Sequence, residues 1–125
     1  MKYVYNFEKL QVWVESKEVT KSIYKITQEF PKNEKFGITS QLRRVSISIC
    51  SNIAEGVSRY TNKDKARFIT ITFSSAVEVV NQLIISCELQ FITQKQYESL
   101  RFQLESITNK LNALRNYLIK PQTNK

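Results

Sequence analysis

Apolar residues along most of this chain recur at alternating spacings of three and four, which is the repeat of a helix with one buried face. Val12, Val19 and Ile23 mark the first such stripe. Four stretches with this pattern follow one another, at about residues 7–29, 38–57, 62–91 and 94–118. The pattern therefore predicts four long helices.

The ends of the predicted helices carry recognisable signals. Asn6 can cap the start of the first helix, and Pro31 ends it because proline cannot donate a backbone hydrogen bond. Thr61 and Thr93, each followed three residues later by an acidic residue or an amide, predict caps for the last two helices. Because only short turns join the helices, we predict an all-α fold, an antiparallel up-down-up-down four-helix bundle formed by residues 1–125 as a single domain.

Two of the predicted helices have more apolar surface than one bundle core requires. The third helix is apolar nearly all round, and the second has an additional apolar side formed by Ile47, Cys50 and Ala54. A chain of 125 residues is too short to cover these surfaces itself, so we predict a homo-oligomer in which copies cover them for one another. The predicted interface positions are Ile47, Ala54, Ile71, Ile85 and Leu89.

Composition narrows the classes of function. Two glycines and two prolines leave little turn chemistry for a β-sandwich or a barrel. The chain has no histidine, which is the commonest general base and metal ligand, and no glycine-rich phosphate loop or nucleophile elbow. We therefore expect no enzyme activity, no catalytic residue, no metal, no cofactor and no small-molecule substrate.

The sequence also favours one location. It contains no run of about 18 apolar residues, and its N-terminus lacks the pattern of a signal peptide. We expect a cytoplasmic protein that does not enter a membrane, with Cys50 and Cys87 reduced. A disulfide between the two cysteines is the less favoured alternative.

Positive charge is the main functional clue from composition. The chain has 19 Lys and Arg residues against 11 Asp and Glu residues, a formal net charge of +8, which favours a polyanionic partner. A solvated face that serves only solubility has equal weight. The predicted nucleic-acid-binding residues are assigned to the turn between the second and third helices, at one end of the bundle: Arg43, Arg44, Arg59, Lys63, Lys65 and Arg67.

The fourth helix offers a second basic surface on its outer face. Its cationic residues, with those that follow it, are Arg101, Lys110, Arg115, Lys120 and Lys125.

Aromatic residues flank the basic turn and occupy the N-terminus, and such residues can stack with nucleobases. They are Tyr60 and Phe68 at the turn and Tyr3, Tyr5 and Phe7 at the N-terminus. Aromatic side chains at helix ends more often close the core, so we favour that interpretation here.

Short motifs are distributed along the chain. They are Phe7-Glu-Lys-Leu10 with Val12-Trp13, Phe30-Pro31 with Glu34-Lys-Phe-Gly37, Gln41-Leu-Arg-Arg44, Ser48-Ile49, Asn52-Ile-Ala-Glu-Gly56 with Arg59, and Ser75 with Glu78. On these motifs, over about residues 7–118, the chain resembles the four-helix-bundle family of 23S rRNA intervening-sequence proteins. That family is also similar to the accessory proteins of diversity-generating retroelements.

The resemblance implies an all-α bundle that assembles into a ring, commonly a pentamer, with a basic surface that contacts RNA or DNA and with no catalysis. Cys50 stands where the family usually has proline, which predicts a straighter second helix. Ser58 stands where glycine is common, and Thr72 and Ser74 stand where alanine and glycine are usual.

Two hypotheses follow. The first is a non-enzymatic, homo-oligomeric nucleic-acid-binding protein whose partners are other copies of the chain together with RNA, DNA or a protein that processes nucleic acid. The second is a protein-interaction scaffold whose basic surface serves solubility or recruits an acidic protein.

Overall fold

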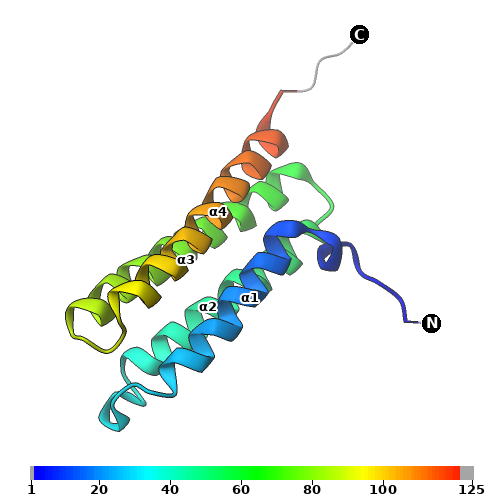
Figure 1. Ribbon diagram of the computed structural model, residues 1–125. Coiled ribbons are helices and arrows are strands. Elements are labelled where there is room, and N and C mark those ends of the chain that lie inside the picture. Colours follow the sequence, from blue (N-terminus) through cyan, green and yellow to red (C-terminus); the bar gives the residue numbers. More distant parts are fainter. Residues whose placement is uncertain (1, 122–125) are drawn as a thin grey trace.

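The structure, a computed structural model, describes residues 2–121 of the chain. This part contains four α-helices, two short 3-10 helices and no strand, so the predicted all-α class is confirmed. The helices lie lengthwise beside one another and are joined by short connections (Figure 1). The elements are η1 (Asn6–Lys9), α1 (Gln11–Thr27), η2 (Lys32–Glu34), α2 (Ile38–Val57), α3 (Asn62–Glu88) and α4 (Gln94–Ile119).

Each long helix packs against two others, and together they enclose one core. α1 contacts α2 and α4, while α3 contacts α2 and α4. The positions on the predicted stripes supply the apolar side chains that have almost no exposed surface. The largest of these are Ile23, Leu42, Ile49, Ile53, Ile69, Leu83, Leu104, Ile107 and Leu111.

The start of the first helix differs from the prediction. Asn6 belongs to the short helix η1, Leu10 is extended at φ −78° and ψ 126°, and α1 begins only at Gln11. Asn6 therefore does not cap α1, and the expected continuous helix from residue 7 is wrong. The break lets Leu10 pack against the core, while the ring of Phe7 meets that of Trp13 edge-on at 5.0 Å between centroids.

The first connection leads into a helix with the predicted bounds. α1 ends at Thr27, two residues earlier than expected, and Pro31 lies in the connection beyond it. The Thr27 hydroxyl donates to the Ile23 carbonyl at 2.7 Å, inside the last turn. α2 then covers residues 38–57 as predicted, and it continues through Cys50 without interruption.

Gly56 sets how closely α2 and α3 approach each other. A Cβ atom on this glycine would lie 2.6 Å from the Cβ of Phe68, well inside van der Waals contact. The glycine of the Asn-Ile-Ala-Glu-Gly motif is thus required by the packing of the two helices. α3 then begins as predicted, because the Thr61 side chain accepts a hydrogen bond from the Asp64 backbone at 3.1 Å.

α3 ends three residues earlier than predicted. Gln90 has a positive φ of 64°, its N–H donates to the Cys87 carbonyl at 3.0 Å, and the N–H of Phe91 donates to the Ser86 carbonyl at 2.8 Å. This pair of bonds is a Schellman motif, which satisfies the last carbonyls of a helix. The ring of Phe91 then packs against that of Phe30, 5.4 Å between centroids.

α4 begins with the predicted capping box. The Thr93 hydroxyl accepts from the Gln96 backbone at 3.0 Å, and the Gln96 side chain accepts from the Thr93 backbone at 2.9 Å. The helix ends at Ile119, one residue later than predicted.

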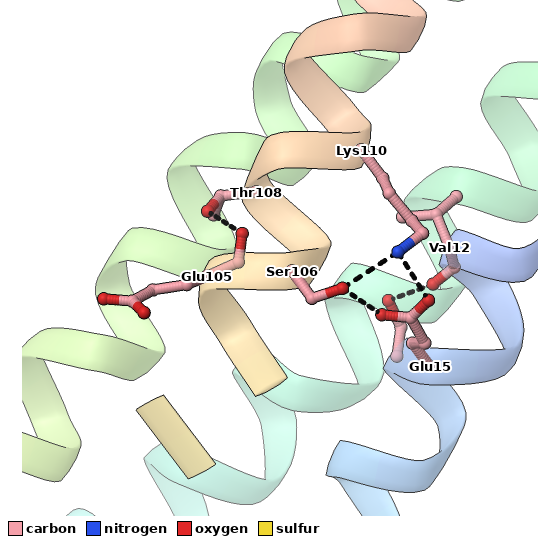
Figure 2. A network of polar contacts seen from close by, with 7 residues as sticks. Val12, Glu15, Glu105, Ser106, Thr108 and Lys110 are labelled. Atoms are coloured by element: carbon pink, nitrogen blue, oxygen red, sulfur yellow. Dashed lines mark hydrogen bonds and ion pairs between the residues drawn. The ribbon is translucent and has the colours of Figure 1, made fainter. Parts of the chain in front are cut away.

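A polar network joins α1 to α4 on the outside of the core (Figure 2). The Ser106 hydroxyl donates to Glu15 at 2.6 Å, and the Lys110 ammonium donates to Ser106 and pairs with Glu15, both at 2.9 Å. Burial alone raises the pKa of Glu15, but the hydrogen bonds from Ser106, Lys110 and Gln11 outweigh it and leave that pKa lowered.

Candidate nucleic-acid interface

The six predicted nucleic-acid-binding residues do not form one cluster. Arg43 and Arg44 lie in the second turn of α2, near the end where η2 is. Arg59, Lys63, Lys65 and Arg67 lie at the turn from α2 to α3. At 1.5 Å per residue, α2 separates the two groups by roughly 20 Å along its axis. The expectation of a single basic cluster at one end of the bundle is wrong for Arg43 and Arg44.

The Arg43 side chain binds to the end of α1 instead of facing solvent freely. Its Nε donates to the Thr27 hydroxyl at 2.8 Å, one of its terminal nitrogens donates to the Tyr24 carbonyl at 3.3 Å, and its guanidinium lies 4.8 Å from the centre of the Tyr24 ring. These bonds fasten α2 to the end of α1. Its neighbour Arg44 is exposed and has no such contacts among the described residues.

The turn from α2 to α3 forms a compact basic surface. The guanidinium groups of Arg59 and Arg67 lie 4.5 Å and 5.2 Å from the centre of the Phe68 ring. Phe68 is only 8% exposed, whereas both arginines and Lys63 are exposed. Lys65 is half-buried. We call Arg59, Lys63, Lys65 and Arg67 the basic turn.

The cations of the basic turn differ from those of α4 in their partners. Within residues 2–121, the ion pairs join Lys21 to Glu18, Arg101 to Glu105 and Lys110 to Glu15, and none involves the basic turn. Asp64, between Lys63 and Lys65, reduces the net charge of the turn, but no carboxylate among residues 2–121 forms an ion pair with its cations.

Most cations on the expected basic face of α4 contact other side chains of the same chain. Arg101 donates a hydrogen bond to the Tyr97 hydroxyl at 2.6 Å and forms an ion pair with Glu105 at 3.5 Å. The Tyr97 contact is the main reason that the pKa of Arg101 is raised. Arg115 donates to the Thr70 hydroxyl at 2.8 Å, which joins α4 to α3. Lys125 lies outside the described residues.

The aromatic residues divide into two groups. Phe7 is partly buried and Phe68 is buried, as expected for side chains that close the core. Tyr3, Tyr5 and Tyr60 are instead 71%, 60% and 102% exposed, so the expectation that they close the core is wrong. The periodicity of buried positions does not extend to these residues, because they lie outside the four α-helices.

Four of the five predicted interface positions are exposed apolar side chains. They are Ile47 (43%), Ile71 (41%), Ile85 (42%) and Leu89 (54%). Two of them, Ile71 and Ile85, lie on α3, and Leu89 directly follows it. α3 is long and apolar enough to cross a membrane, a test that the core helix of a soluble protein also passes. Of its most apolar stretch, 39% is buried inside the chain.

Ala54 and Cys50 do not lie on a free apolar side of α2. Ala54 lines a groove under the N-terminal segment, together with Tyr3 and Tyr5. Cys50 faces α1, since its sulfur lies 3.5 Å from the Thr20 hydroxyl, and burial raises the pKa of its thiol. Both cysteines are free.

In the described part of the chain, no group of three or more His, Cys, Asp and Glu side chains is placed to hold a metal ion.

Comparison with solved structures defines the class of fold. A protein of unknown function from the S23 ribosomal protein family of Bacteroides thetaiotaomicron, determined by crystallography at 1.70 Å, superimposes with a TM-score of 0.78. The match covers 84% of this chain and 95% of that one, at 24% sequence identity. No curated protein matches the chain.

The family follows from the sequence itself. The family described as 23S rRNA-intervening sequence protein matches residues 8–113, which include α1, α2, α3 and most of α4. The chain belongs to this family, as its motifs predict.

Proposed function

We propose that this chain is a non-enzymatic RNA-binding protein that works as a homo-oligomer. Each copy forms an antiparallel up-down-up-down bundle, and the copies assemble into a ring, a pentamer in the arrangement that the family resemblance implies. RNA is the favoured partner, and a protein that processes nucleic acid binds to the same particle. The protein acts in the cytoplasm, outside any membrane.

The observation that carries RNA binding is the excess of exposed cations at the basic turn that form no ion pair. Cations that contact phosphates release condensed counterions, which favours binding to any nucleic acid. Arg59, Lys63 and Arg67 are exposed at one end of the bundle, and no carboxylate pairs with them among residues 2–121. Arg44 adds a cation farther along α2, whereas Arg43 serves the packing of α1 against α2.

Exposed apolar surface on α3 supports the assembly. Ile71 and Ile85 on α3, with Leu89 directly after it, are between 41% and 54% exposed, and the other side of this helix fills the core. Covering them with a second copy removes this area from water, which is favourable by about 25 cal/mol for each Å² of apolar surface. A ring also multiplies the net charge of +8 that each copy carries, so weak phosphate contacts act together.

The test is the salt dependence of RNA binding. We expect fluorescence anisotropy with a generic single-stranded RNA to show binding at ~50 mM salt and much weaker binding at ~200 mM. The triple variant Arg59→Gln, Lys63→Gln and Arg67→Gln should bind less tightly, and its salt slope should fall by about two, since each phosphate contact to a single strand contributes ~0.7.

A matched control removes the same charge at the other end of the bundle. Lys25, Lys32 and Lys95 are exposed and lie near the connections from α1 to α2 and from α3 to α4. Replacing these three with Gln should leave the salt slope close to that of the native chain. Absence of RNA binding at the lower salt, or equal losses in the two variants, would contradict the proposal. The first result would favour the scaffold hypothesis.

A further inference from the structure

Exposed aromatic side chains gather at the same end of the bundle as the basic turn. Tyr60 projects entirely into solvent, between Arg59 and Lys63 in the sequence. Tyr3 and Tyr5 belong to the N-terminal segment, which enters beside the end of α2 because η1 contacts α2 (Figure 1). Exposed aromatic rings that gather in one region of a surface are typical of binding sites, so this end of the molecule has the chemistry of a binding surface.

A groove lies between the N-terminal tyrosines and the end of α2, which the basic turn follows. Its volume is about 400 Å³, within the range of small-ligand pockets. The N-terminal segment forms one wall and the last turn of α2 forms the other. The lining residues are Tyr3, Tyr5, Asn6, Phe7, Ala54, Glu55, Val57 and Ser58. Ser58, the last lining residue, directly precedes Arg59 and Tyr60, so the groove lies next to the start of the basic turn.

The rings along the N-terminal wall form a continuous series. Tyr3 meets Tyr5 edge-on at 4.8 Å between centroids, and Tyr5 lies nearly parallel to Phe7, with an interplanar angle of 25° and a separation of 6.2 Å. Phe7 in turn contacts Trp13 at 5.0 Å. The inner rings are held by the core, so the outer tyrosines are positioned by packing.

We propose that this end of the molecule binds single-stranded RNA, with bases stacked on Tyr60 and on the tyrosines of the groove and phosphates on the basic turn. The inference rests on the proposed RNA binding and specifies the form of the RNA. Aromatic faces can stack only with bases that are not already stacked inside a duplex. A basic strip beside exposed rings is the arrangement that proteins use for single strands.

Two acidic residues near the groove are consistent with bases in the groove and phosphates on the basic turn. Glu55 lines the groove, so phosphates are repelled from it and must follow the side of Arg59 and Lys63. A carboxylate inside the groove can accept a hydrogen bond from the amino group of a base. Glu8 already accepts the backbone N–H of Tyr5 at 2.9 Å, which holds the segment in place.

The test compares oligoadenylate with an RNA duplex of the same length, using the whole chain. We expect the single strand to bind more tightly at equal salt. Tyr60→Ala should weaken its binding about tenfold, because stacking on one ring is worth roughly 1–3 kcal/mol for each base. Duplex binding and the salt slope should not change. Tyr60→Phe keeps the ring and should bind as the native chain does.

Phe36→Ala is the matched control, since Phe36 is an 88% exposed aromatic residue in the connection before α2, at the far end of the bundle. It should have no effect, whereas Tyr3→Ala combined with Tyr5→Ala should act as Tyr60→Ala does. If single-stranded RNA and duplex bind equally, or if the tyrosine variants bind as the native chain, the inference fails while RNA binding stands. If neither RNA binds, both proposals fail. A change of particle mass in the tyrosine variants, measured by light scattering, would instead assign these rings to contacts between copies.

Discussion

Gly56 shows how one residue determines the spacing of two helices. A methyl group at this position would come within 2.6 Å of the Cβ of Phe68. The guanidinium groups of Arg59 and Arg67 lie over the ring of this phenylalanine. The clash involves atoms close to the backbone, so α2 and α3 would have to move apart. The same movement would displace Arg59, which follows α2, from the Phe68 ring on α3.

We expect Gly56→Ala to destabilise the fold despite the better helix propensity of alanine. Overpacking costs about 1–3 kcal/mol, against a gain of up to about 1 kcal/mol from propensity. Urea denaturation should show a net loss. Ser51→Ala, at an exposed position of α2, is the control and should be neutral or stabilising. An equal stability of both variants would show that the helices adjust without cost.

Glu15 makes the free energy of unfolding depend on pH. Its pKa is lowered in the folded chain, so the folded state binds a proton less readily than the unfolded state does. The stabilisation is therefore complete above the ordinary value of 4.5 and is lost as the pH falls below it. Lys110 is 42% exposed, and solvent screening limits the effect to about 1 kcal/mol.

The expected result is that Glu15→Gln lowers the free energy of unfolding at pH 7 and has progressively less effect below pH ~4. Denaturation curves at several pH values measure this difference. The control is Glu18→Gln, because Glu18 pairs with Lys21 only at 3.6 Å and on the open surface. A constant difference across the pH range would rule out the Ser106 and Lys110 contacts as its source.

Among the elements, α1 and α2 are joined by a side chain that charge alone would assign to function. Arg43 and Arg44 are adjacent and chemically identical, and both belong to the Gln-Leu-Arg-Arg motif. Only Arg43 reaches across to Thr27 and Tyr24 at the end of α1. The motif therefore combines one packing residue with one exposed cation.

This pair provides its own comparison. Arg43→Gln should lower the stability of the fold by about 1–3 kcal/mol, since two hydrogen bonds from a charged group are lost and the buried Thr27 hydroxyl is left without a donor. Arg44→Gln should change stability by less than about 0.5 kcal/mol and should weaken RNA binding. Thermal unfolding and anisotropy measure the two effects. Equal losses of stability would contradict the separation of roles.

Sequence patterns predicted the helices best where the local chemistry is unambiguous. The capping threonines Thr61 and Thr93 fixed the starts of α3 and α4, and the bounds of α2 agree fully. The end of α3 was missed because glutamine rarely occupies the left-handed position that Gln90 takes. The start of α1 was missed because residues 6–10 contain no glycine or proline to mark the break between η1 and α1.

The site was less predictable than the fold, because charge in a sequence carries no information about partners in space. Arg43 and Arg44 looked equivalent, and Lys110 looked like part of an open basic face until Glu15 was found beside it. Exposure of the tyrosines was missed for a related reason. Tyr3 and Tyr5 precede α1, where the helical repeat gives no indication of burial.

At the scale of the whole molecule, the proposed assembly depends on the exposed side of α3. We expect light scattering of the native protein to give a mass that is a multiple of 14.7 kDa. Ile71→Glu should reduce the mass to that of a single copy, since a charge cannot be buried there without a partner. Phe102→Glu, on the 75% exposed surface of α4, should leave the mass unchanged. A native protein that remains a single copy at high concentration would refute the ring.

The two ends of the bundle differ in a way that helps experiments. The connection between α1 and α2, with its bare Phe36, lies at the end opposite to the basic turn. The Cys50 thiol is held against Thr20 and is harder to ionise than a free thiol, which slows its reaction with maleimides. Once the other free cysteine, Cys87, is replaced by serine, a fluorophore attached through Phe36→Cys would report on the tumbling of the particle from a place that leaves the groove untouched.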